Sequence, residues 1–127
     1  MMSVRFEIYA PISVSGESIN ARLELEGEFR TTKNERGGPL LFWFYEIEEE
    51  LDFDEGIDVI FKIFSGFRRD EIDRIGAEFC VVNYMKTFST FTVSSKISDV
   101  SIQKLGQLRS ELRIDCYPTV EGAVDVL

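Results

Sequence analysis

The sequence contains no histidine. This absence removes the side chain that most often acts as a general base near neutral pH, and the commonest metal ligand in proteins. It also excludes zinc sites built from cysteine and histidine, and the Ser-His and Cys-His pairs of nucleophilic catalysis. We therefore expect no enzymatic activity, no metal and no other cofactor. A hydrolase that works with two carboxylates is the remaining catalytic alternative.

Two patterns for phosphate or cation binding are incomplete. The pair Gly37-Gly38 lacks both the glycine spacing and the Lys-Ser/Thr of a phosphate-binding loop. A calcium loop that started at Asp52 would need an acid at its fifth position, where Gly56 stands. The first pattern therefore indicates a turn, and the second indicates the acidic first turn of a helix.

Cysteine is scarce, with only Cys80 and Cys116, and both lie in apolar segments. Two isolated cysteines form neither a disulfide framework nor a Cys-x-x-Cys motif. We expect buried free thiols in a reducing cytoplasm, with a single bridge between neighbouring strands as the alternative. The chain also lacks a recognisable signal peptide and an apolar run of the ~20 residues that a membrane helix needs, so we expect a cytoplasmic protein.

Basic residues are few relative to acidic ones: 14 Lys and Arg stand against 23 Asp and Glu, for a net charge of −9. Phosphate backbones and anionic membranes attract clusters of Lys and Arg, and the sequence has no such cluster. We therefore predict no nucleic-acid and no membrane partner. Acidity favours association with a basic protein; the alternative is that it only keeps the chain in solution.

The length of 127 residues fits one domain, and we treat 1–127 as a single unit with a loosely held tail over 118–127. Hydrophobic residues make up 44% of the chain and include 11 phenylalanines, which indicates a core filled with large rings. Alternation of apolar and polar residues predicts strands. These cover 3–10, 40–47, 77–85 and 112–117, and segment 88–93 is either a hairpin partner or an extended loop.

Helical spacing of apolar residues predicts four helices between these strands. They cover 16–25, 52–65, 68–76 and a segment capped by Ser98 or Ser101, in which Ile102, Leu105 and Leu108 face inward. Segment 23–29 also alternates and is an alternative strand start, whereas 31–39 is polar and glycine-rich and reads as an exposed loop. The order predicts an α+β fold with a single mixed, mostly antiparallel sheet and helices packed against it, in a ferredoxin-like arrangement.

Segment 40–64 joins the strongest strand to the most regular helix. Leu41, Trp43 and Tyr45 point to one face of this strand, and Leu40, Phe42, Phe44 and Ile47 approximate the other. Apolar character on both faces indicates an interior strand covered on both sides, or one side with an aromatic patch. Asp52 and Glu55 have the spacing of a capping box, with Asp54 as an alternative cap. Inward positions then follow at helical spacing: Ile57, Ile60, Phe61 and Phe64.

Eight acids fall within thirteen residues between the strand and the helix. Like charges packed this closely repel one another unless solvent or a partner compensates. We interpret the segment as a docking surface for a Lys/Arg-rich protein, with neighbouring rings, including Phe53, as anchors. The predicted partner-binding residues are Trp43, Tyr45, Glu46, Glu48, Glu49, Glu50, Asp52, Asp54, Glu55 and Asp58. The alternatives are a solvated strand-to-helix turn, or a small-ligand or regulatory domain with a pocket lined by Trp43, Tyr84 and phenylalanines.

Several segments resemble a family of small bacterial α+β domains, the domain-of-unknown-function family 4279 (DUF4279). They are VRFEIYA, FWFYE with the acidic helix start after it, EFCVVNYM and the ending SIQKLGQLRSELRIDCYP. The ending is the most specific, with a Leu-Gly step in a helix and a strand that closes in Ile-Asp-x-Tyr at 114–117. The resemblance spans residues 3–118.

This resemblance implies a function without catalysis, because the family has no established enzyme activity. Such domains are similar to immunity proteins of contact-dependent and other polymorphic toxin systems, which are small, often acidic and cytoplasmic. These proteins bind a toxin domain encoded beside them, and many of the toxins are basic nucleases. The resemblance therefore implies a cognate toxin domain as the partner, and it assigns no role to any single residue. We expect the chain itself to be a monomer or weak dimer.

Overall fold

The computed structural model describes residues 2–88 and 97–118 of the chain. Their elements run in the order β1 (Met2–Pro11), α1 (Gly16–Leu23), β2 (Glu28–Lys33), β3 (Pro39–Ile47), α2 (Phe53–Phe64), α3 (Phe67–Ile75), β4 (Phe79–Phe88), α4 (Asp99–Leu108) and β5 (Glu111–Pro118). None of the helices in these two stretches is long and apolar enough to cross a membrane.

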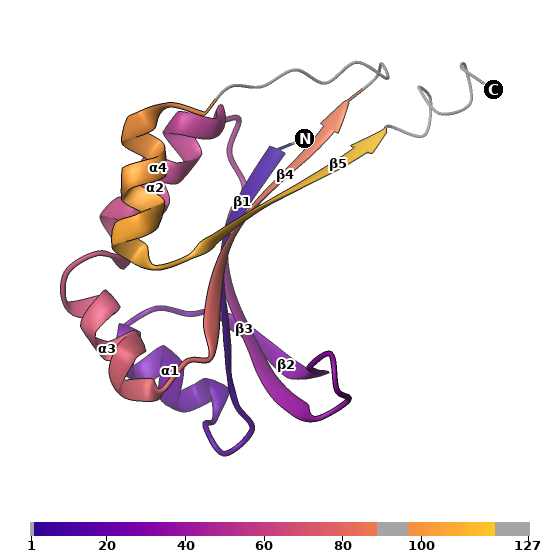
Figure 1. Ribbon diagram of the computed structural model, residues 1–127, viewed down its shortest axis with the longest axis vertical. Coiled ribbons are helices and arrows are strands. Elements are labelled where there is room, and N and C mark those ends of the chain that lie inside the picture. Colours follow the sequence, from indigo (N-terminus) through magenta and orange to yellow (C-terminus); the bar gives the residue numbers. More distant parts are fainter. Residues whose placement is uncertain (1, 89–96, 119–127) are drawn as a thin grey trace.

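The strands form one five-stranded sheet in the order β2-β3-β1-β4-β5. Every neighbouring pair is antiparallel except β4 and β5, which run parallel. The helices lie together on one face of the sheet and leave the other face open (Figure 1). The predicted α+β class with a mixed, mostly antiparallel sheet is confirmed. If α3 is set aside, the elements from β1 to β4 follow the β-α-β-β-α-β order of ferredoxin-like domains, and helix α4 and the edge strand β5 come after them.

The core lies between the sheet and the helices, and α2 is at its centre. Alternation along β1 directs Val4, Phe6 and Ile8 toward the helices, and all three are buried. Phe6 stacks on Phe64 of α2 with ring centroids 4.1 Å apart. The predicted capping box is confirmed, since Asp52 accepts from the Glu55 amide and Glu55 accepts from the Asp52 amide. The inward-facing residues of β1 therefore pack against the apolar side of α2, as the sequence pattern predicts.

One predicted loop is partly strand. Residues 31–33, expected in an exposed loop, belong to β2 and pair with β3, Pro39 begins β3, and 34–38 form the turn. There the Asn34 side-chain oxygen accepts from the amides of Arg36 and Gly38 at 2.9 and 2.8 Å, an Asx-type turn. Because β2 is an edge strand and mostly exposed, all its residues except Phe29 are polar. It therefore lacks the alternation that identified the other strands.

Three predicted side-chain orientations are wrong. Ile47 packs against the core on the same face as Tyr45, as the period of two requires. Ile102 is 52% exposed, because α4 meets the core through Ser101, Leu105 and Leu108 at a spacing of four and three. Cys116 is exposed while Cys80 is buried, and both are free thiols. Cys116 lies opposite Lys86 in the β4–β5 register, so the alternative of a bridge to Cys80 is wrong as well.

Two further predictions fall wholly or partly outside the described residues. The alternating segment 88–93 lies there beyond Phe88, which ends β4. Of the predicted tail, Pro118 is the last residue of β5, and 119–127 lie outside. The remaining strand and helix predictions are confirmed to within a few residues, including α1 with Ser15 as its cap and α4 with Ser98 as its cap.

Candidate functional site

Acidic side chains from two strands converge at the β2–β3 end of the sheet. The register places Glu28 of β2 opposite Phe44 of β3, so residues just before Glu28 and just after Phe44 lie side by side. A hollow of about 470 Å³ opens between them. We call it the acidic hollow; its lining residues are Glu26, Glu28, Phe44, Tyr45, Glu46 and Glu48. Sequence analysis found the β3 half of this site and missed Glu26 and Glu28.

Repulsion between these carboxylates is visible at Glu48. The pKa of Glu48 is raised, first by a hydrogen bond with Glu46 and by the negative charge of Glu46, and then by desolvation and the charge of Glu28. Glu46 itself accepts from Arg5 Nε at 2.5 Å. Within the described residues, Glu26, Glu28 and Glu48 have no ion pair. A cation that entered the acidic hollow would therefore meet three carboxylates whose charge the fold leaves uncompensated.

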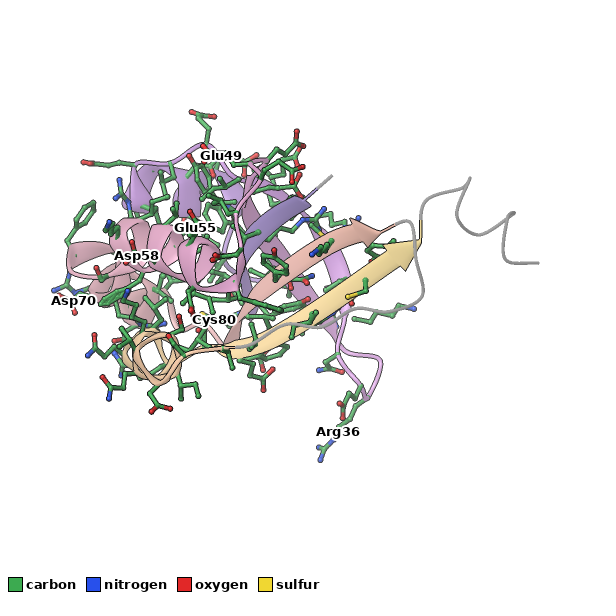
Figure 2. The ribbon with its side chains drawn as sticks, turned by 90° about the horizontal axis from the view of Figure 1, so that it is seen from above. Arg36, Glu49, Glu55, Asp58, Asp70 and Cys80 are labelled. Carbon is green, nitrogen blue, oxygen red and sulfur yellow. The ribbon has the colours of Figure 1, made fainter. Side chains whose placement is uncertain are left out.

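The next acids along the chain divide into exposed residues and residues engaged within the fold. Glu49 and Glu50 are exposed, and Glu49 projects away from the body of the molecule (Figure 2). Asp52 and Glu55 are exposed but bond to each other in the capping box. Glu49 and Glu50 therefore extend the acidic surface beyond the hollow.

Asp54 and Asp58 connect α2 to α4. Asp54 Oδ1 accepts from the Ser98 amide at 3.1 Å and from the Ser101 hydroxyl at 2.6 Å, at the N-terminus of α4. Asp58 accepts from Lys104 of α4 at 2.7 Å and from Lys62 at 2.8 Å. These hydrogen bonds lower the pKa of both carboxyl groups. Both carboxylates are therefore engaged within the fold, unlike those of Glu49 and Glu50.

The lowered pKa values of Asp54 and Asp58 predict acid sensitivity. A carboxyl whose pKa is lower in the folded state stabilises the fold above its unfolded pKa of about 3.8, and this contribution is lost as the pH falls through the folded value. We expect Asp54→Asn/Asp58→Asn to lose less stability than the unmodified chain between pH 7 and pH 3. Urea midpoints of both chains at the two pH values test this. An equal loss in both would contradict it.

The predicted aromatic anchors lie in the core. Trp43 has no exposed surface, and its indole N–H donates to Asn20 Oδ1 at 2.7 Å. Phe53 is 7% exposed and stacks on Tyr84, which is itself buried. The prediction of Trp43 as a surface anchor is therefore wrong, because its ring packs in the core on the helix-covered face of the sheet. Trp43 and Tyr84 line neither the acidic hollow nor the hollow on the opposite face of the sheet. Tyr45 is half-buried and keeps a place in the acidic hollow.

The open face of the sheet has an aromatic row that explains the apolar character of both faces of β3. Tyr9 lies between Phe79, at a centroid distance of 4.4 Å, and Phe42, at 5.0 Å, and Phe44 follows at 5.3 Å from Phe42. The guanidinium of Arg5 lies 4.2 Å from the centre of the Phe44 ring. The alternative of one face bearing an aromatic patch is thus the correct one for β3.

Beside this row, a second hollow of about 220 Å³ draws residues from all five strands. We call it the open-face hollow. Glu7 and Asn83 line it and are each only 2% exposed. Arginines from β1, β2 and β5 also line it. Sequence analysis missed this site because its members alternate with core residues on separate strands, where polar residues ordinarily face water. The one available signal was the polar face of β1, with Arg5, Glu7 and Tyr9.

Comparison with known proteins assigns no family: no family model matches the chain, and no curated protein and no solved structure matches it. Among the described residues, no group of three Cys, Asp or Glu is arranged to hold a metal ion. The features that bear on function are therefore the acidic hollow and the open-face hollow.

Proposed function

We propose that this protein is a non-enzymatic module that binds a basic protein through the acidic hollow and the exposed acids beside it. The most concrete form of this proposal is an immunity protein that neutralises a cognate toxin domain, such as a basic nuclease. The observation that supports it is the convergence of Glu26, Glu28, Glu46 and Glu48 from two strands around one hollow. The resemblance of the sequence to small immunity proteins points the same way.

The acidic hollow suits a Lys or Arg side chain in two respects. Its carboxylates attract the charged head and raise the rate of encounter, which for charged protein pairs reaches 10–10³ times the neutral rate. The rings of Phe44 and Tyr45 offer apolar surface to the aliphatic stem. Binding of a cation would also relieve the repulsion that raises the pKa of Glu48. Association should therefore be fast at low salt and slower as salt screens the charges.

A growth assay tests the immunity function directly. The C-terminal domain of the protein encoded immediately upstream is expressed with and without this chain. We expect that domain to be toxic and its toxicity to be relieved only by this chain. A harmless domain, or one that stays toxic in the presence of this chain, would count against the immunity proposal.

Charge reversal tests the surface. Glu26, Glu28 and Glu48 are exposed and form no ion pair with residues 2–88 or 97–118, so their joint replacement by lysine should leave the fold intact. We expect association with the toxin domain, followed by stopped-flow at low salt, to slow by about 10-fold or more. The matched control is lysine at Glu35, Asp70 and Glu78, which are also exposed and have no ion pair in the described part of the chain. It has the same net charge, so equal slowing in both variants would refute the acidic hollow as the interface.

A further inference from the structure

The open-face hollow has a buried polar floor on a side of the sheet that no helix in the described chain covers. Glu7 of β1 and Asn83 of β4 are each 2% exposed, as little as most core residues. Burying a carboxylate is costly unless it is paired and hydrogen-bonded. A polar pair at such depth on a solvent-facing sheet is therefore a feature that sheet packing alone does not require.

The partners of Glu7 are few and weak. Asn83 Nδ2 donates to Glu7 Oε2 at 3.2 Å, the Tyr9 hydroxyl donates to Oε1 at 3.4 Å, and the Arg5 guanidinium stays 4.0 Å away. Burial and the charge of Glu7 raise the pKa of Tyr9, so its hydroxyl keeps its proton and remains a donor. Asn83 Oδ1 is buried and has no hydrogen-bond partner within the described residues. The floor of the hollow therefore has acceptor oxygens on Glu7 and Asn83 that receive weak hydrogen bonds or, among the described residues, none.

The rim of the hollow carries the opposite charge. Arg5 is engaged with Glu46 and Arg113 with Asp115, at 2.5 and 3.2 Å. Arg30 of β2 lies over the Phe42 ring, 5.1 Å from its centre, and has no carboxylate partner in the described part of the chain. The positive charges of Arg113 and Arg30 both reach the Tyr9 hydroxyl, where they oppose the rise in its pKa. The guanidinium of Arg30 and the buried carboxylate of Glu7 therefore line the same small hollow.

We propose that the open-face hollow binds a small zwitterion of the amino-acid class. Its ammonium group would donate to Glu7 and Asn83 Oδ1, and its carboxylate would accept from Arg30. An anion alone would meet the charge of Glu7, and a cation alone would meet the guanidinium of Arg30, so a molecule that carries both charges fits best. A space of about 220 Å³ matches a ligand of that size. This site is separate from the acidic hollow, and the inference does not depend on the proposed protein partner.

The test is a titration of the full chain with each of the twenty L-amino acids, followed by amide chemical shifts in ¹H–¹⁵N spectra. We expect saturable shifts in β1, β2 and β4 with at least one of them. Its deaminated acid and its decarboxylated amine should each bind at least about 10-fold more weakly, because each lacks one of the two charges. Arg30→Gln should weaken binding by a similar factor. Arg30 is exposed and forms no ion pair among the residues that the structure describes, so this variant should fold.

The matched control is Arg36→Gln, since Arg36 lies on the turn that joins β2 to β3 and points away from the sheet (Figure 2). It should bind like the unmodified chain. Glu7→Gln should abolish the preference for the ammonium group, and if that variant does not fold, Arg30→Gln decides alone. Three results would overturn the proposal: no saturable shift with any amino acid, equal binding of the deaminated acid, or unchanged binding by Arg30→Gln.

Discussion

Replacement of Phe64 by alanine is expected to lower the free energy of unfolding by about 3–5 kcal/mol. Phe64 closes the last turn of α2, has no exposed surface and stacks on Phe6 at 4.1 Å. The rings of Trp43 and Tyr45 meet it edge-on, with centroids 6.3 and 6.1 Å away. Alanine would leave a cavity among rings that are themselves held by two strands, so the site has little room to collapse.

Phe61→Ala, in the same helix, is the control. Phe61 is only partly buried and packs at the margin of the core, with the Lys104 ammonium 6.0 Å from its ring centre. Its loss should cost clearly less, because solvent can occupy part of the vacated space. Urea denaturation of the three chains measures both differences. Similar losses at Phe61 and Phe64 would show that the ring cluster around Phe64 is not the centre of the core.

Gly27→Ala is expected to cost about 1–3 kcal/mol or more, an overpacking effect. A Cβ atom at Gly27 would lie 2.2 Å from the buried indole of Trp43. The Gly27 backbone and the Trp43 ring cannot move apart easily, because both are held by Asn20. The Gly27 amide and the Trp43 indole N–H donate to Asn20 Oδ1 at 3.0 and 2.7 Å. One amide oxygen thus holds the chain before β2 against β3, and an added methyl group must break that arrangement.

Gly106→Ala provides the opposite expectation for the same chemical change. Gly106 lies within α4, has nothing within 4 Å of an added Cβ and adopts an ordinary helical φ. Alanine there should stabilise the chain by about 0.4–1 kcal/mol, because it restricts the unfolded chain and favours the helix. Thermal unfolding of the two variants tests the pair. The same sign of change in both would refute the close approach at Gly27.

The sequence predicted elements well where local rules act alone. Alternation in β1 and the capping box of α2 depend on neighbours in the chain, and both are as expected. Strand β2 is missed by the sequence prediction, which has 23–29 only as an alternative strand start and 31–39 as a loop, because an exposed edge strand needs no apolar face. The inward face of α4 was misjudged because a spacing of three cannot be told from one of four over so few apolar residues.

The candidate sites could be predicted only in part, because both are made by contacts between distant strands. The acidic run contained Glu46 and Glu48, but only the β2–β3 register brings Glu26 and Glu28 beside them. The same run contained Asp54, which accepts hydrogen bonds from Ser98 and Ser101 at the start of α4. No local sequence pattern predicts these contacts. Trp43 is predicted as a surface anchor but is a core residue. The sequence of a strand with aromatic residues on both faces does not show which face the helices cover.

The two outer strands of the sheet differ from the inner ones in a way that affects behaviour in concentrated solution. β2 contains Glu28, Arg30 and Lys33, and β5 contains charges at alternate positions and ends in Pro118. Charged side chains and proline at such borders discourage another chain from adding its own strand, the first step of amyloid-like growth. Self-association by strand addition is thereby disfavoured at both ends of the sheet.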